Sequence, residues 1–231
     1  MNELSEWIST NTNIDLNHFP IDWFHLGADI KNSAPTTGLP KNYKSVLAKI
    51  TRKISFLMVG TIEPRKGHAQ ILAAFEDLWA NEVDVSLVIV GKNGWMVEEL
   101  VNKLSRHSEL GRRLFWLKGI SDEYLEEVYA ASTCLIAASE GEGFGLPLIE
   151  AAQYGLPIIV RDIPVFREVA GEYAFYFINR PGPEALAEAI NNWLSLYKLG
   201  QHPKSDLMPW QTWQESTERL LSILSIKEKS S

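Results

Sequence analysis

Short, nearly unbroken apolar runs recur along the chain from residue 54 onward, and a glycine-containing turn follows most of them. The runs occupy residues 54–59, 85–90, 114–117, 133–138, 156–160 and 175–178. Apolar runs that do not alternate with polar residues are typical of parallel strands buried on both faces of a sheet. The pattern therefore predicts about six strands.

Stretches with helical periodicity lie between these runs. Apolar residues recur at helical spacing in residues 67–81, 95–107 and 183–197, and Ser121 followed by acidic residues has the composition of a helix start. Strands that alternate with helices form βαβ units and a parallel sheet with helices on both faces. The predicted fold class is α/β, a Rossmann-like, doubly wound parallel sheet of about six strands.

The two ends of the chain follow different patterns. Residues 1–45 contain Asn, Pro and Gly residues that interrupt any long periodicity, although residues 22–29 have the pattern of a short strand and a turn. Apolar residues at helical spacing return in residues 210–226. We therefore divide the chain into an irregular segment 1–45, a Rossmann-like domain 46–200, and a terminal segment 201–231 with one more helix.

Composition narrows the possible functions. The 231 residues carry a formal net charge of -7, which disfavours binding to nucleic acid or to an anionic membrane surface. The single cysteine, Cys134, excludes a disulfide within the chain and favours a reducing compartment. No apolar stretch has the length of a membrane span, and the first residues lack the pattern of a signal peptide. These features together predict a cytoplasmic location.

A glycine-rich stretch follows the apolar run at 133–138 and leads into a segment that favours a helix. Gly141, Gly143 and Gly145 alternate with other residues. A glycine-rich loop at a helix N-terminus presents free backbone N–H groups and the positive end of the helix dipole to an anion.

Two carboxylates accompany this anion-binding pattern. Glu142 lies in the loop, and Glu150 lies about two turns into the expected helix. Carboxylates accept hydrogen bonds from hydroxyl groups. Amides for a phosphate and carboxylates for hydroxyls together suit a sugar that is linked to a phosphate.

The turn after the first apolar run carries two cations. Residues 60–67 read Gly-Thr-Ile-Glu-Pro-Arg-Lys-Gly, so that Arg65 and Lys66 come directly before the next helix. This turn matches neither the dinucleotide fingerprint nor the Walker loop. A guanidinium and an ammonium group both suit phosphate oxygens.

The stretch from Glu142 to Glu150 also carries a family resemblance. With its Gly-Phe-Gly-Leu-Pro interior and the Ala-Ala that follows, it resembles the Glu-x7-Glu signature of the retaining nucleotide-sugar glycosyltransferases of the GT-B fold, in glycosyltransferase family 4, group 1. The resemblance implies that this chain is the C-terminal, donor-binding half of a GT-B fold. Residues 22–29 resemble the linker between the two halves, so that residues 1–45 would hold this linker and a remnant of the N-terminal acceptor domain.

The resemblance implies roles for the residues of both loops. Those that would hold the donor sugar are Glu142, Gly143, Phe144, Gly145 and Leu146. Glu150 would hold the ribose hydroxyls, and Lys66 matches a lysine that contacts the donor diphosphate. The family often has an arginine at the position of Thr61, so Arg65 would supply that charge here. Residues expected to line the donor pocket from the ends of strands are Gly60, Gly91 and Lys118.

The implied function is retaining transfer of a hexose from a nucleotide diphosphate sugar in polysaccharide or glycolipid biosynthesis, with GDP-mannose as the first candidate donor. Glu142, Lys66 and Arg65 would act in catalysis, and the leaving phosphate would help to deprotonate the acceptor. The five histidines do not cluster at ligand spacings, so we expect no metal, and no cofactor besides the donor as co-substrate. A glycan or lipid-linked acceptor would bind through an N-terminal domain or a partner chain, which can add peripheral association with the inner face of the membrane.

Other interpretations remain open at this point. A non-catalytic nucleotide-sugar-binding subunit or regulatory module would keep the same loops. A nicotinamide-dependent oxidoreductase is disfavoured, because the first turn has Pro-Arg-Lys where that fold needs closely packed glycines. His68, beside Lys66, is either structural or part of the pocket. The helix at 210–226 either packs on the Rossmann-like domain or crosses to the other half of the fold.

Overall fold

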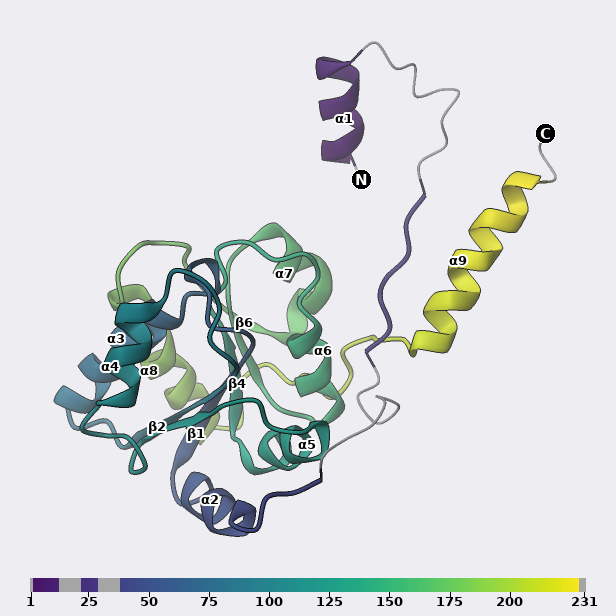
Figure 1. The fold of residues 1–231 in the computed structure, drawn as a ribbon. Helices are drawn as coiled ribbons and strands as arrows, with labels where there is room; N and C mark the ends of the chain where they lie inside the picture. Colours follow the sequence, from purple (N-terminus) through teal and green to yellow (C-terminus); the bar gives the residue numbers. More distant parts are fainter. Residues whose placement is uncertain (1, 13–21, 29–37, 229–231) are drawn as a thin grey trace. The chain divides into compact units, whose positions relative to one another are not determined.

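The computed structural model describes residues 2–12, 22–28 and 38–228 (Figure 1). The chain divides into two compact units, one within residues 28–210 and the other formed by residues 1–27 with residues 211–231. The domain boundaries predicted at residues 45 and 200 stay a prediction.

The larger unit is built on one parallel sheet. Its strands are β1 Ile54–Val59, β2 Val85–Val90, β3 Leu114–Leu117, β4 Cys134–Ala137, β5 Ile158–Arg161 and β6 Phe175–Phe177. The strand order is β3-β2-β1-β4-β5-β6, and every neighbouring pair is parallel. This arrangement confirms the predicted Rossmann-like, doubly wound fold.

Helices cover both faces of the sheet (Figure 1). The helices whose buried residues join one core layer are α3 His68–Ala80, α4 Glu98–Ser105 and α8 Glu184–Lys198. Those that join the other layer are α2 Tyr43–Ile50, α5 Asp122–Ala131, α6 Leu146–Gln153 and α7 Pro164–Ala170.

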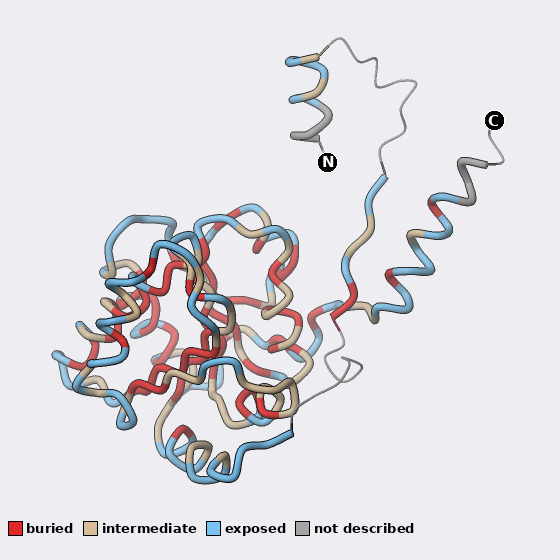
Figure 2. The backbone as a smooth tube through the Cα atoms, in the orientation of Figure 1, coloured by how far each residue is buried: buried red, intermediate tan, exposed pale blue. Residues whose placement is uncertain are grey.

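Alternate residues of one strand point into opposite core layers. In β1, Phe56 and Met58 pack into the layer of α3, whereas Leu57 packs into the layer of α5. Figure 2 accordingly shows the central strands as buried. The two-sided burial explains why these runs are apolar at nearly every position.

Three helices were missed in the sequence: α1 Asn2–Asn11, α2 and α7. Residues 1–45 were predicted to be irregular, but α1 and the start of α2 fall within them. In α2, Val46, Leu47 and Ile50 form an apolar stripe that packs into the layer of α5. The helix is too short to be recognised in the sequence, and its stability comes from these tertiary contacts.

One predicted helix begins later than expected. A helix was predicted from residue 95, but α4 begins at Glu98. Met96 has a φ of +51°, which is the left-handed region, and a continuous right-handed helix cannot pass through it.

The predicted strand at residues 22–29 is wrong for the part that the structure describes. Residues 22–28 form no regular secondary structure, and Asp29 lies outside the described residues. Instead, the backbone carbonyl of His25 accepts hydrogen bonds from Ser216 Oγ at 2.7 Å and from the Gln211 side chain. The segment is thus bonded to two side chains near the C-terminal helix, of which Ser216 lies in that helix and Gln211 just before it.

The terminal helix is α9 Trp213–Glu228, which belongs to the same unit as residues 22–27. Thr212 and Glu215 form a reciprocal capping box, because Thr212 N donates to Glu215 Oε2 at 2.7 Å and Glu215 N donates to Thr212 Oγ1 at 3.1 Å. A Cβ added to Gly27 would lie 2.3 Å from Trp213 Cα, so only glycine fits there. The helix therefore groups with the linker-like segment and not with the sheet.

Replacing Trp193 by Ala is expected to lower the free energy of unfolding by about 3–5 kcal/mol. Trp193 is fully buried, and its ring packs edge-on against Phe56 with 5.4 Å between ring centroids. Trp95 is 56% exposed, so Trp95→Ala should change the same quantity by at most about 0.5 kcal/mol. Denaturant unfolding measures both variants, and equal effects would contradict this account of the core.

Candidate functional site

The candidate site lies where the strand order reverses, between β1 and β4. Ligands of open α/β sheets bind in the crevice beyond the carboxyl ends of the strands at such a point. The loop after β1 (residues 60–67) and the loop after β4 (residues 138–145) meet there, and Glu140 N donates to the carbonyl of Arg65 at 2.8 Å.

Gly67 allows this close approach of the two loops. A Cβ at this position would lie 2.3 Å from the carbonyl oxygen of Ala138, and its φ of +76° is in the left-handed region. Both constraints require glycine. Helix α3 begins with the next residue, so its N-terminal end lies beside the crevice.

Lys66 and Glu142 form an ion pair across the crevice. Lys66 Nζ lies 2.5 Å from Glu142 Oε2, and the two side chains are 15% and 14% exposed. Both line a small hollow of about 20 Å³ below the loops. A volume of this size has room for about one water molecule.

Arg65 joins the same cluster. Its guanidinium donates to the carbonyl of Gly141 at 3.1 Å, lies 3.1 Å from Glu63 Oε2 and lies 3.8 Å from Glu142 Oε2. The structure therefore brings together the three residues that the sequence predicted for catalysis. Each cation has a carboxylate neighbour, so the cluster is close to neutral.

The glycine-rich loop ends at the N-terminus of α6. Gly145 has a φ of +94°, and an added Cβ would lie 3.1 Å from the ring of Phe166 behind the loop. By contrast, an added Cβ at Gly141 or Gly143 would meet no atom within 4 Å. The backbone at these two glycines therefore faces open space, as a loop that receives a ligand would.

Glu150 contacts α5 and not the ion pair. Its Oε2 accepts a hydrogen bond of 2.7 Å from the buried hydroxyl of Tyr129. Burial raises the pKa of the Glu150 carboxyl, and the hydrogen bond from Tyr129 opposes that rise. The ring of Tyr129 stacks on Tyr154 at 5.5 Å, which fixes the position of its hydroxyl.

Two of the predicted pocket glycines pack the loops together. A Cβ on Gly91 would lie 1.9 Å from the carbonyl oxygen of Gly60, and Gly60 N donates to Val90 O at 2.9 Å. These glycines therefore have a clear role in packing, whereas the adjacent Thr61 is exposed.

Lys118 lies at a separate hollow of about 370 Å³ near the end of β3. Its Nζ is 3.5 Å from the centroid of the Trp116 ring, a cation–π contact. The hollow is lined by Gly38, Leu39, Pro40, Lys118, Gly119, Ile120, Ser121 and Tyr124.

His68 is buried and directly follows the loop of residues 60–67. Burial, and then the charge of Lys66, lower its pKa to about 4. The backbone of Gly60 and Glu63 opposes this shift, although neither ring nitrogen has a partner in hydrogen-bond geometry among the described residues. A neutral imidazole that is 1% exposed is a structural group in this conformation.

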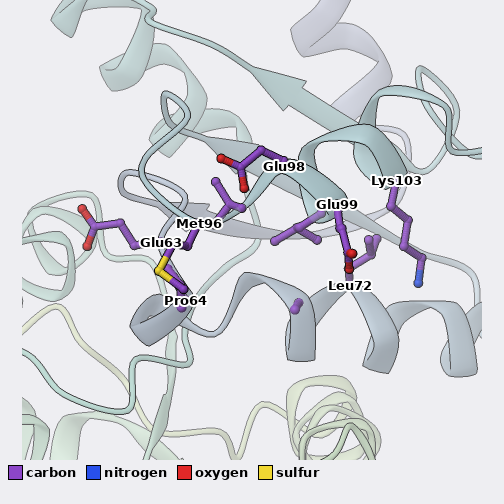
Figure 3. Close-up of a pocket in the computed structure, with 10 residues that line it drawn as sticks. Glu63, Pro64, Leu72, Met96, Glu98, Glu99 and Lys103 are labelled. Carbon is purple, nitrogen blue, oxygen red and sulfur yellow. The ribbon is translucent and has the colours of Figure 1, made fainter.

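A larger cavity, of about 650 Å³, lies between α3 and α4 (Figure 3). It shares Glu63 with the cluster but is not lined by Lys66, Glu142 or Glu150. Its charged lining residues are three carboxylates, Glu63, Glu98 and Glu99, and one cation, Lys103. This negative balance does not suit a phosphate, so cavity size does not identify the anion site.

The sequence interpretation missed two residues that support the site, Tyr129 and Arg161. Tyr129 bonds Glu150, and Arg161, the last residue of β5, donates to the carbonyl of Ala138 through Nε and Nη2 at 3.0 and 2.9 Å. The available signal was an arginine directly after the apolar Ile-Ile-Val run.

Two features are absent from the described residues. These residues contain no group of three or more His, Cys, Asp or Glu side chains placed to hold a metal ion. None of the helices in the described ranges combines the length and the apolar character needed to span a membrane.

Comparison with known proteins matches residues 41–205 to the family described as Glycosyl transferases group 1. The serotype-specific mannosyltransferase WbdA of Escherichia coli is 52% identical over 224 residues. This alignment covers 97% of the present chain and 27% of that protein, so the chain spans only about a quarter of that relative's length.

Two solved structures share the fold. Sucrose-phosphate synthase from Thermosynechococcus elongatus has a TM-score of 0.74 at 19% identity, over 100% of this chain and 57% of that chain. Anabaena HepE, solved in complex with UDP and glucose, has a TM-score of 0.65 at 18% identity, over 87% of this chain and 56% of that chain. At these identities the likenesses show a shared fold.

Replacing His68 by Leu is expected to remove part of the pH dependence of stability. The folded-state pKa of about 4 lies below the ordinary value of 6.5, so the unfolded chain binds more protons between these values. Stability is then fully present above pH 6.5 and falls as the pH decreases, by about 3 kcal/mol for this shift.

Urea unfolding from neutral to acidic pH measures this difference between wild type and His68→Leu. The wild-type chain should lose more stability than the variant on acidification. Parallel curves would show that the pKa of His68 is the same in the folded and the unfolded chain.

Proposed function

The chain belongs to the group 1 glycosyl transferases, and from this premise we propose that it binds a nucleotide diphosphate sugar at the crevice of Lys66 and Glu142 for retaining transfer of a hexose. The ion pair at the point where the strand order reverses carries this proposal. GDP-mannose is the first candidate donor.

The proposal gives the two members of the ion pair different ligands. Lys66 Nζ has three donors, so it can keep Glu142 and also bind a phosphate oxygen. The second oxygen of the Glu142 carboxylate can accept from a sugar hydroxyl.

The loops also provide neutral donors for the diphosphate. Backbone N–H groups from Gly143 to Leu146 lie at the N-terminal end of α6, where the helix dipole favours an anion. Pro147 has no N–H, and Leu148 N donates to the carbonyl of Gly145 at 2.9 Å, so the amides before Pro147 are the donors available to a ligand.

These groups support a front-face reaction. The bond from the anomeric carbon to the diphosphate oxygen breaks while a bond to the acceptor hydroxyl oxygen forms on the same face. The acceptor proton passes to an oxygen of the leaving diphosphate, and Arg65 and Lys66 stabilise the charge that develops there. Glu142 and Glu150 bind different parts of the donor and do not act as a hydrolase pair.

The similarity to WbdA, which is a mannosyltransferase by name, supports a mannosyl donor and a role in polysaccharide or glycolipid biosynthesis. The glycan or lipid-linked acceptor would bind to an N-terminal domain or partner chain, in the cytoplasm and at the inner face of the membrane. Glu150 would hold the ribose, Gly60, Thr61 and Gly91 would line the donor pocket, and Lys118, at its separate hollow, would lie beside the base.

The first test is the shift of the thermal midpoint of unfolding with GDP, UDP, ADP, their sugar conjugates and NAD. A nucleoside diphosphate at a hundred times its Kd should stabilise the chain by about 2.7 kcal/mol. Lys66→Ala should weaken this binding by about 1.5–3 kcal/mol, since a charged hydrogen bond to phosphate is lost.

Lys103→Ala is the matched control. Lys103 lies outside the crevice and forms an ion pair with Glu76, with 2.6 Å between Nζ and Oε2. This variant should bind nucleotide like the wild-type chain. The proposal is wrong if no nucleotide stabilises the wild-type chain, or if both lysine variants bind equally well.

Binding should also depend on the ionisation of Glu150. A carboxylate accepts hydrogen bonds from ribose hydroxyls better than a carboxylic acid does, and burial raises the pKa at which Glu150 ionises. The Kd of the nucleoside diphosphate is therefore expected to fall as pH rises through this pKa. Glu150→Gln should flatten that profile and weaken binding by about tenfold at neutral pH.

Calorimetric titration of the wild-type chain and of Glu150→Gln with the same nucleotide measures both profiles. The ionisation of the nucleotide phosphates affects both proteins equally and drops out of the comparison. An unchanged pH profile in Glu150→Gln would exclude Glu150 from the ribose site.

A further inference from the structure

Arg161 is a buried cation whose recorded hydrogen bonds all go to neutral groups. It is 1% exposed, and among the ion pairs of the described residues none includes its guanidinium. Its hydrogen bonds go instead to neutral oxygens of Ala138, Asn179 and Gln70. Burial lowers the pKa of the Arg161 guanidinium, and the charge of Glu140 opposes this shift. Burying a cation is costly, so its hydrogen bonds matter for where the groups that accept them lie.

The partners of Arg161 lie on both sides of the crevice. Ala138, which receives two of its hydrogen bonds, opens the glycine-rich loop, and the same carbonyl faces Gly67 in the loop after β1. Gln70 lies in the first turn of α3, directly after the loop that carries Lys66. Arg161 therefore ties the two loops together from behind.

The tie continues to the end of β6. Arg161 Nη1 donates to Asn179 Oδ1 at 3.0 Å, and Gln70 Nε2 donates to the carbonyls of Arg180, at 2.9 Å, and Gly182. The planar guanidinium can serve these directions at once, whereas an ammonium group cannot reproduce a fork that bonds one carbonyl twice.

We propose that Arg161 is a positioning residue that sets the spacing of the loops after β1 and β4, and thereby the binding of the donor diphosphate between them. The identity of the ligand rests on the proposed function, whereas the spacing of the loops does not. Arg161 is 1% exposed, so it acts through the loops that it bonds and not by contact with the donor.

Hydrogen exchange in the ligand-free chain tests the spacing role. Arg161→Met and Arg161→Lys should each raise exchange about tenfold in peptides that cover residues 60–67 and 138–146, because both remove the fork to Ala138. Exchange in α8 should stay unchanged. If Arg161→Met fails to fold, Gln70→Leu, at a partly exposed position, breaks the link to α3 alone and should loosen residues 60–67.

Arg167→Met is the matched control. Arg167 is an exposed arginine on α7 that bonds Asp162 through Nε and Nη2, both at 2.7 Å, so its loss removes the same charge from a nearby element. Both crevice loops should exchange as in the wild-type chain.

Titration with GDP and GMP tests the effect on the ligand. The Kd for GDP should rise about tenfold in both Arg161 variants, and the Kd for GMP by at most about twofold to threefold, because the second phosphate depends most on the spacing of the two loops. A purely structural arginine would weaken both nucleotides alike, and a role of charge alone would be rescued by lysine.

The two proposals fail separately. Unchanged exchange in the crevice loops, equal losses for GDP and GMP, or rescue by Arg161→Lys would each overturn the positioning role. Failure of the wild-type chain to bind any nucleoside diphosphate would overturn the proposed function, and the exchange result would still decide the role of Arg161.

Discussion

The contact between Gly67 and the carbonyl of Ala138 is the constraint on which the crevice depends. It brings the loops after β1 and β4 to backbone distance, and any side chain at position 67 would separate them. The ion pair of Lys66 with Glu142 and the bond from Glu140 N to Arg65 O both require that approach. The parallel sheet places the loops at one edge, but the missing side chain of one residue lets them touch.

The charges of the crevice are balanced before a ligand arrives. Arg65 and Lys66 each have a carboxylate neighbour, and the chain as a whole is acidic. Attraction of an anion over a long distance is therefore weak, and the proposed site would rely on short, directional donors. A site of this kind gains selectivity from the fixed positions of its donors. The glycines and buried hydrogen bonds around the crevice hold the two loops in those positions.

Much of the fold was predictable because parallel strands buried on two faces leave a strong apolar signal. The meeting of Lys66 with Glu142 also followed, since both were expected at the carboxyl edge of the sheet. The sequence could not show α2, because its short apolar stripe needs α5 as a packing partner. It also could not show that α4 begins only after Met96, because a positive φ at a non-glycine residue has no signature in the sequence. Arg161 and Tyr129 were missed because their roles come from contacts between segments far apart in the chain.

The bond between His25 and Ser216 has a consequence for how the protein is made. These residues are 191 positions apart, and the chain between them contains the whole parallel sheet. During synthesis, domains fold from the N-terminal side as they emerge from the ribosome, and contacts distant in sequence form late. The segment 22–27 is thus translated early but must wait, without its helical partner, until the sheet domain has left the ribosome and α9 has followed it.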